Sequence, residues 1–234
     1  MRRTSFWFVC FAILTATTLT AMQVVEYKSG IAWPEPPVID PGPPGGVPSD
    51  AIVNKHTSYL TPLLEEFITA APFFLVATSD AEGNCDVSPK GDPPGAVRIL
   101  DRRTIVVPDR PGNRRVDGHR NVLENPHIGL IFIIPNVDET VRVNGRAFLS
   151  ADPALLQTMA VQGKAPKLGI VVEIDEVYMH CARAFLRSGM WKPESWPDPD
   201  SIPTLAAIWN EQKDLPPPDE SQGKRQEEYR KTLY

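Results

Sequence analysis

VSPKGDPPGAVRILDRRTIVVPDRPGNRRVDGHRNVLENP, residues 87–126, is the most basic part of an acidic chain and is rich in turn-forming residues. Two short apolar runs, 96–100 and 104–107, flank a polar triplet, a pattern typical of a β-hairpin. The prolines and the glycine of 108–112 predict a turn, and a helical pattern follows from 116 to 124. The chain therefore passes from a strand through a glycine turn and clustered arginines into the start of a helix.

This arrangement is a candidate anion-binding site. Backbone N–H groups at a helix N-terminus point toward a ligand, and arginines add paired donors to phosphate oxygens. Asn113, Arg114 and Arg115 are therefore candidate phosphate ligands, and a solvated basic turn is the alternative. Two adjacent arginines do not easily point the same way. We expect one on the anion and the other in an ion pair with Asp109 or Asp117.

Composition restricts the class of protein. The chain has 234 residues, of which 42% are hydrophobic and 23% charged, enough for one domain with a substantial core. A net charge of −5 argues against a general nucleic-acid binder. The three cysteines have no metal-ligand spacing, so we expect no metal site, and a reduced compartment is the simpler interpretation.

The chain ends differ from the middle. Residues 1–21 resemble a signal peptide, and a misassigned start before Met22 explains them equally well. Residues 22–49 are rich in proline and glycine and predict an extended arm. We expect the folded domain over 50–198, then a helix and a charged, disordered tail over 199–234. A cytoplasmic location is predicted, with export as the alternative if the signal is real, and no stable membrane partner is expected.

The middle of the chain predicts short strands with helices inserted between them. The expected strands are 73–78, 84–88, 96–100, 104–107, 128–134, 140–150 and 168–178. The expected helices are 50–71 with a break at Pro62, 116–124, 153–162, 181–188 and 203–212, and 89–95 is expected to be a loop. Neither a βαβ rhythm nor a GxGxxG motif is present, so the pattern favours a small antiparallel barrel over a Rossmann fold.

Four segments carry a resemblance to a known family: FFLVATSDAEGNCDVSPKGDPPG (73–95), VPDRPGNRRVDGHRNVLENPHIGLIFIIP (107–135), ETVRVNGRAFLS (139–150) and MHCARAFLRSGMW (179–191). Together they resemble the flavin-binding split-barrel proteins related to pyridoxamine 5′-phosphate oxidase, in a branch of uncharacterised FMN-dependent enzymes. The resemblance covers about 67–196, most of the expected domain.

The resemblance implies a mainly β fold with peripheral helices, a six-stranded antiparallel split β-barrel. It also implies a homodimer with two FMN molecules at the interface. The expected activity is an FMN-dependent oxidoreductase acting on an unknown small substrate. The alternatives are a split barrel that uses F420 or haem, and a flavin-binding protein without turnover. Because no classical catalytic motif is present, no catalytic acid or base is assigned, and the cofactor would supply the redox chemistry.

The resemblance adds candidate cofactor ligands on the same stretch of chain. Ser88 and Lys90 lie where a strand opens into a loop, and a lysine there can act as a point charge on phosphate. Arg120 lies about one and a half helical turns beyond Arg115 and reaches the same anion only by leaning back. The alternative for these basic residues is ordinary solvation.

Three further candidates lie later in the chain. Arg142 and Asn144 share one face of a strand that, in the family, approaches the flavin of the partner subunit. Trp191 is an aromatic residue near a chain reversal and is a candidate neighbour of the flavin ring or of the substrate. An exposed barrel face and a packing tryptophan are the alternatives.

Overall fold

The computed structural model describes residues 49–218, 226–227, 229–231 and 233–234. The chain divides into two units, Met1–Asn54 and Lys55–Tyr234. In the first unit the described residues form one short helix, α1 (Asp50–Val53). The predictions of a signal-like segment over 1–21 and of an arm up to residue 48 lie outside the described residues.

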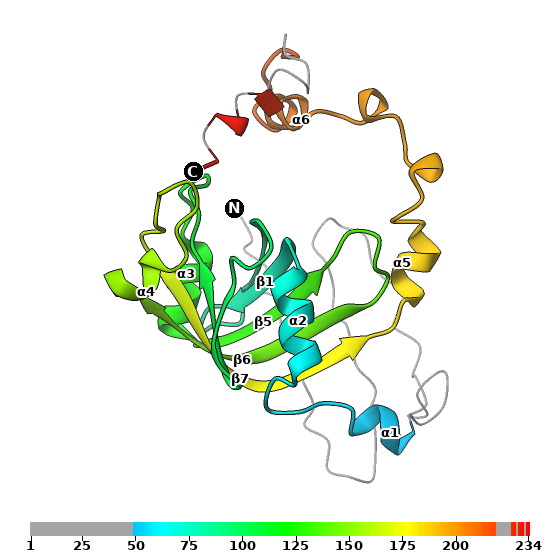
Figure 1. Cartoon of the computed structure of the whole chain (residues 1–234). Coiled ribbons are helices and arrows are strands. Elements are labelled where there is room, and N and C mark those ends of the chain that lie inside the picture. Colours follow the sequence, from blue (N-terminus) through cyan, green and yellow to red (C-terminus); the bar gives the residue numbers. More distant parts are fainter. Residues whose placement is uncertain (1–48, 219–225, 228, 232) are drawn as a thin grey trace, which may run out of the picture. The chain divides into compact units, whose positions relative to one another are not determined.

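The second unit is built on one antiparallel sheet of seven strands (Figure 1). The strands are β1 (Phe73–Ser79), β2 (Cys85–Gly91), β3 (Arg98–Asp101), β4 (Thr104–Pro108), β5 (His127–Ile133), β6 (Thr140–Ser150) and β7 (Gly169–His180). Their order across the sheet is β2-β1-β5-β6-β7-β4-β3. Within the described residues no ladder joins the two edge strands, β2 and β3, so the barrel is split between them. The predicted mainly β split-barrel fold is confirmed, with seven strands in place of six.

One face of the sheet encloses the main hydrophobic core. Side chains alternate between faces along a strand, and β1 follows this period, with Phe74 and Val76 buried and their neighbours more exposed. Phe132, Val143 and Val172 contribute from the central strands and are fully buried. Alternate residues of these strands therefore build the core.

β2 is longer than the sequence predicts. Residues Pro89–Gly91 were expected in a loop, but Pro89 pairs with Leu75 and Gly91 pairs with Phe73 of β1. Proline lacks a backbone donor and is tolerated on an edge strand, where one side of the ladder is unpaired. The correction places Ser88 and Lys90 on a strand instead of at the mouth of a loop.

The ladder between β6 and β7 contains a β-bulge that the sequence pattern does not reveal, with Asp175 of β7 as the extra residue. The register with β7 shifts between Asn144 and Gly145, so that Asn144 pairs with Glu176 and Gly145 with Ile174. A side chain at 145 would place its Cβ 2.0 Å from the carbonyl oxygen of Glu173. The bulge therefore requires glycine at this position.

The helices are short, and α2 and α3 pack against the sheet. They are α2 (Pro62–Ala70), α3 (Asp117–Glu124), α4 (Pro153–Gln157), α5 (Arg183–Ser188) and α6 (Leu205–Gln212), with 3₁₀ turns at Pro193–Ser195 and Pro199–Ser201. Pro62 begins α2 rather than bending a longer helix, which fits its preference for the first helical turn. None of the helices in the described residues has the length and apolarity needed to cross a bilayer.

α4 ends five residues earlier than predicted. The Thr158 hydroxyl donates to the carbonyl of Leu155 at 2.7 Å, a local bond that competes with helix continuation. Gln162 and Gly163 then adopt positive φ angles and reverse the chain. The loop that follows, 164–167, lies beside the cavity described below.

Candidate anion-binding site

A cavity of about 1240 Å³ lies beside the edge strand β2. Its walls come from β1 and β2, from the turn between β4 and α3, from the loop 164–167, and from Tyr234. Ligand pockets usually measure about 300–1,000 Å³, so this cavity has room for a cofactor together with a small substrate.

The charged residues of the lining are six basic and four acidic. The basic residues are Lys90, Arg110, Arg114, Arg115, Lys164 and Lys167, and the acidic ones are Asp86, Asp92, Asp109 and Asp117. The whole chain carries a net charge of −5, so basic residues are concentrated here against the overall balance. The cavity is therefore suited to an anion.

The turn that carries the arginines has a specific backbone conformation. The Asn113 side-chain oxygen accepts the backbone N–H of Arg115 at 3.0 Å, which closes an Asx turn. Arg114 lies between them with φ of 63°, in the left-handed region that residues other than glycine rarely adopt. Strained backbone of this kind persists where the surrounding structure holds it and is common at ligand sites.

The two adjacent arginines have different environments. Arg115 Nε donates to Asp117 Oδ2 at 2.7 Å, so the ion pair expected for one of the two arginines is formed by Arg115 with Asp117. In the described part of the chain, no hydrogen bond or ion pair engages the guanidinium of Arg114. The Arg114 donors are therefore available to a ligand.

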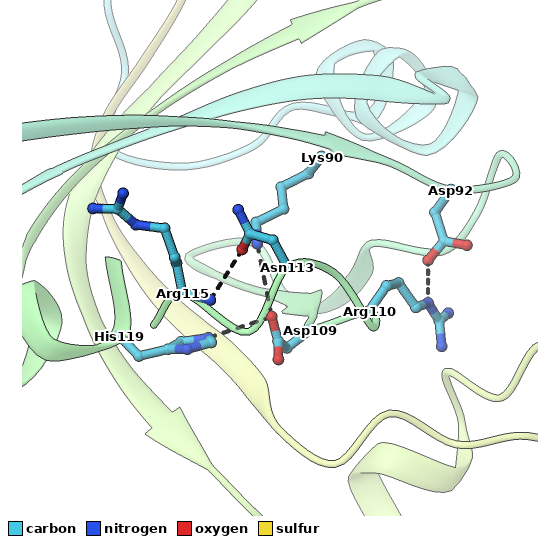
Figure 2. A network of polar contacts seen from close by, with 7 residues as sticks. All are labelled: Lys90, Asp92, Asp109, Arg110, Asn113, Arg115 and His119. Carbon is cyan, nitrogen blue, oxygen red and sulfur yellow. Dashed lines mark hydrogen bonds and ion pairs between the residues drawn. The ribbon is translucent and has the colours of Figure 1, made fainter. Parts of the chain in front are cut away.

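Asp109 is the centre of a charged network at the base of the turn (Figure 2). Its Oδ1 lies 3.7 Å from Lys90 Nζ and 3.4 Å from His119 Nε2. Burial by itself would raise the pKa of Asp109, but interactions with His119 and Lys90 outweigh it and hold the pKa below its ordinary value. Asp109 is therefore an anion at neutral pH and holds Lys90 toward the cavity.

A second ion pair stands at the other side of the same view (Figure 2). Arg110 Nε donates to Asp92 Oδ2 at 2.5 Å, and its Nη2 donates to the carbonyl of Met159 at 2.7 Å. Only 4% of the Asp92 side chain and 12% of the Arg110 side chain are exposed. Arg110 is therefore a structural cation whose Nε and Nη2 are already engaged.

Hydrogen bonds fix the turn and α3 to the barrel. The backbone N–H of Asp109 donates to the carbonyl of Leu168 at 3.0 Å. On α3, Asn121 donates to the Thr78 hydroxyl at 3.0 Å inside the core, and Asn125 donates to the Ser79 hydroxyl at 2.8 Å. The arginine turn is thus held at both of its ends, which limits the entropy lost when it binds a ligand.

Five of the sequence-predicted ligands meet in this cavity: Ser88, Lys90, Asn113, Arg114 and Arg115. They come from two segments, on β2 and on the turn after β4. Arg120 is exposed on α3 and does not line the cavity. Its spacing of about one and a half helical turns from Arg115 agrees with this position outside the cavity.

The other three candidates lie outside the cavity of their own chain. Arg142 Nη1 donates to the Tyr178 hydroxyl at 3.0 Å, and Asn144 donates to Glu176 at 2.6 Å, each across the β6–β7 ladder. Their role toward a flavin of the partner subunit stays a prediction.

Trp191 has a packing environment within its own chain. Its indole N–H donates to the carbonyl of Val137 at 3.0 Å. Its ring stacks on Phe185 with the ring centroids 5.7 Å apart. Contact with a flavin or a substrate stays a prediction for this residue as well.

Sequence reasoning missed several residues of this site. His119 lies on α3 and Asp92 beyond the end of β2, and neither has a local pattern that marks it as a site residue. Lys164, Lys167 and Tyr234 line the cavity from regions expected to be a loop and a disordered tail. The described residues contain no cluster of three or more His, Cys, Asp or Glu side chains that could hold a metal ion.

Comparison with known proteins gives one family. The family described as pyridoxamine 5′-phosphate oxidase matches residues 60–181, more than half of the chain and the region that contains the sheet and most of the cavity. No match was found among curated proteins.

Solved structures with a similar fold share little sequence. A putative pyridoxamine 5′-phosphate oxidase from Lactobacillus delbrueckii is 21% identical, with 52% of this chain and 95% of that chain covered and a TM-score of 0.41. An F420 reductase is 18% identical, with 48% and 94% covered and a TM-score of 0.38. An FMN-binding protein from Syntrophomonas wolfei is 12% identical, with 51% and 86% covered and a TM-score of 0.39.

Proposed function

We propose, from the premise that this chain belongs to the pyridoxamine 5′-phosphate oxidase family, that it is an FMN-dependent oxidoreductase acting on a small substrate. Membership assigns the chain to a general class of flavin-type oxidoreductases. FMN as the cofactor, and turnover of a substrate, are the finer parts of the proposal. The substrate itself is left open.

The observation that carries the proposal is the Arg114 guanidinium. It stands on a strained turn at the edge of a large cavity, and no described side chain engages it. Phosphate oxygens accept paired hydrogen bonds from a guanidinium, which suits Arg114 to the phosphate group of FMN. The neighbouring ion pair of Arg115 with Asp117 holds the turn in place without using Arg114.

Other residues of the chain would complete the binding site. Lys90, held by Asp109, would add a second positive charge beside the phosphate. The Ser88 hydroxyl on the same strand is a further candidate donor. Val87 and Val116 line the cavity with exposed side chains and offer apolar surface to a planar ring system. When bound, the flavin would supply the electron-transfer chemistry.

Substitution of Arg114 by alanine should weaken FMN binding by about 1.5–3 kcal/mol, the usual contribution of a hydrogen bond to a charged group. The free energy of unfolding of the flavin-free protein should change little, because no described group in the protein depends on this side chain. Fluorescence titration with FMN measures the first quantity, and urea denaturation measures the second.

Arg120→Ala is the matched control, since it removes an exposed arginine from the adjacent helix outside the cavity. It should leave FMN affinity unchanged. Equal affinities of the wild type, Arg114→Ala and Arg115→Ala would remove this turn from the cofactor site.

The absorption spectrum of the purified protein tests the cofactor itself. A flavin spectrum, with FMN released on denaturation, supports the proposal. A Soret band would indicate haem, and a deazaflavin spectrum would indicate F420. Reduction by a nicotinamide donor followed by turnover would separate an oxidoreductase from a protein that only stores flavin.

We also propose that the functional form is a homodimer with FMN at the interface. The cavity is open at its rim, where Val87 is 59% exposed and Val116 is 41% exposed. A flavin seated there would be partly solvated in a single chain. Phe148 on β6 and Met179 on β7 are also exposed, at 51% and 63%, and offer apolar surface to a partner.

Binding of FMN should therefore strengthen dimerisation. A ligand that binds only the assembled site favours assembly through mass action. Sedimentation velocity of flavin-free and FMN-loaded protein, at several concentrations, should show a lower dimer dissociation constant with FMN. A monomer that retains one FMN at low micromolar concentration would contradict a shared site.

A further inference from the structure

Tyr234 belongs to the wall of the cavity although it lies far along the chain from the other lining residues. Its hydroxyl donates to Asp92 Oδ1 at 3.1 Å, across 142 positions of sequence. Its ring lies over the guanidinium of Arg110, 5.7 Å from atom Cζ to the ring centroid. Lys164 Nζ donates to its main-chain oxygen at 2.8 Å.

These three contacts specify where the residue lies. They come from the segment after β2, the turn after β4 and the loop after α4, and they engage the hydroxyl, the ring and the main chain separately. Burial, together with the hydrogen bond to Asp92, raises the pKa of Tyr234 above its ordinary value. The phenol therefore stays neutral and keeps its donor role toward Asp92.

The contacts of Tyr234 do not involve the two cations proposed for the phosphate, although its main-chain oxygen accepts from Lys164. Asp92 and Arg110 already neutralise each other, and the Arg110 nitrogens donate to Asp92 and to Met159. No contact of Tyr234 among the described residues involves Arg114 or Lys90. Tyr234 thus adds an aromatic surface to the cavity without competing for the phosphate.

We propose that Tyr234 is a ligand-contacting residue of this cavity, where its ring lies against the planar ring system of the bound flavin while the turn at Arg114 holds the phosphate. The inference rests on the proposed function, because it assumes a flavin in the cavity. It predicts separate roles for two residues: Tyr234 contacts the aromatic part of the ligand, and Arg114 binds the anionic part.

Riboflavin and FMN together test these separate roles, because riboflavin has the same ring system and lacks the phosphate. Both ligands are titrated by fluorescence into the full-length wild type, Tyr234→Ala, Tyr234→Phe and Arg114→Ala. Tyr234→Ala should raise the dissociation constants of both ligands about tenfold, the scale of a lost aromatic contact. Tyr234→Phe should bind both ligands within about threefold of the wild type, because it keeps the ring and loses only a hydrogen bond to Asp92 that does not contact the flavin. Arg114→Ala should weaken the binding of FMN and leave the binding of riboflavin unchanged.

The outcomes that overturn the inference are distinct. Unchanged binding of both flavins by Tyr234→Ala, with FMN still weakened by Arg114→Ala, would exclude Tyr234 from the site and leave the proposed function standing. Tighter binding by Tyr234→Ala would show that the residue occupies the flavin's place. Binding of neither flavin by the wild type would overturn the proposed function and this inference together.

Discussion

Replacing Arg110 by methionine is expected to lower the free energy of unfolding by about 3–5 kcal/mol. Asp92 is almost fully buried, and Arg110 is its cationic partner at 2.5 Å. Removing the cation leaves a carboxylate in a poorly solvated site, and that cost exceeds the value of the pair itself. The carbonyl of Met159 also loses its donor.

Urea denaturation of the variant and the wild type measures this change. Arg115→Met is the matched control, because it also breaks an arginine–aspartate pair, but one in which 77% of the arginine side chain is exposed. The control should cost less than about 1 kcal/mol.

A double variant, Asp92→Leu with Arg110→Met, removes both charges and should recover much of the lost stability. A single Arg110→Met variant as stable as the control would show that Asp92 is accessible to water. A double variant less stable than the single one would show that lost packing, rather than the uncompensated charge, accounts for most of the change in the free energy of unfolding.

Replacing Gly145 by alanine is expected to lower the free energy of unfolding by about 3 kcal/mol, near the upper end of the usual cost of overpacking. The added Cβ would lie 2.0 Å from the Glu173 carbonyl oxygen and 3.3 Å from the Asp175 nitrogen. Both are backbone atoms of the neighbouring strand β7. The strands must separate at the bulge, at the centre of the sheet, because no flexible side chain can yield.

Gly91→Ala is the matched control for a glycine in a strand. Its Cβ would meet Pro72 and Phe73 at 3.8 and 3.9 Å, which is ordinary contact. The control should change stability by less than about 1 kcal/mol, whereas Gly145→Ala should shift the denaturation midpoint clearly. Equal midpoints for the two variants would mean that β6 and β7 pair without a close approach at this bulge.

The sequence alone determined most of the fold because the relevant signals are local. Short apolar runs located the strands, as the expected range 140–150 shows for β6. Proline and glycine located the turns, including the turn after β4 that carries Arg114. Four ordered motifs were sufficient to recognise the family, which the match over 60–181 confirms. An ion pair of one arginine with Asp109 or Asp117 was also expected, and the structure has it between Arg115 and Asp117.

Only the tertiary structure decided which distant side chains share the cavity. Tyr234 meets Asp92 across 142 positions, and His119 reaches Asp109 because α3 packs against β1 and β2. The bulge between β6 and β7 and the strand pairing of Pro89 likewise depend on a neighbouring strand. Short-range patterns report on the local backbone and on which face of a strand is buried. They carry no information about which segments meet across the fold, because that is determined by strand order and packing.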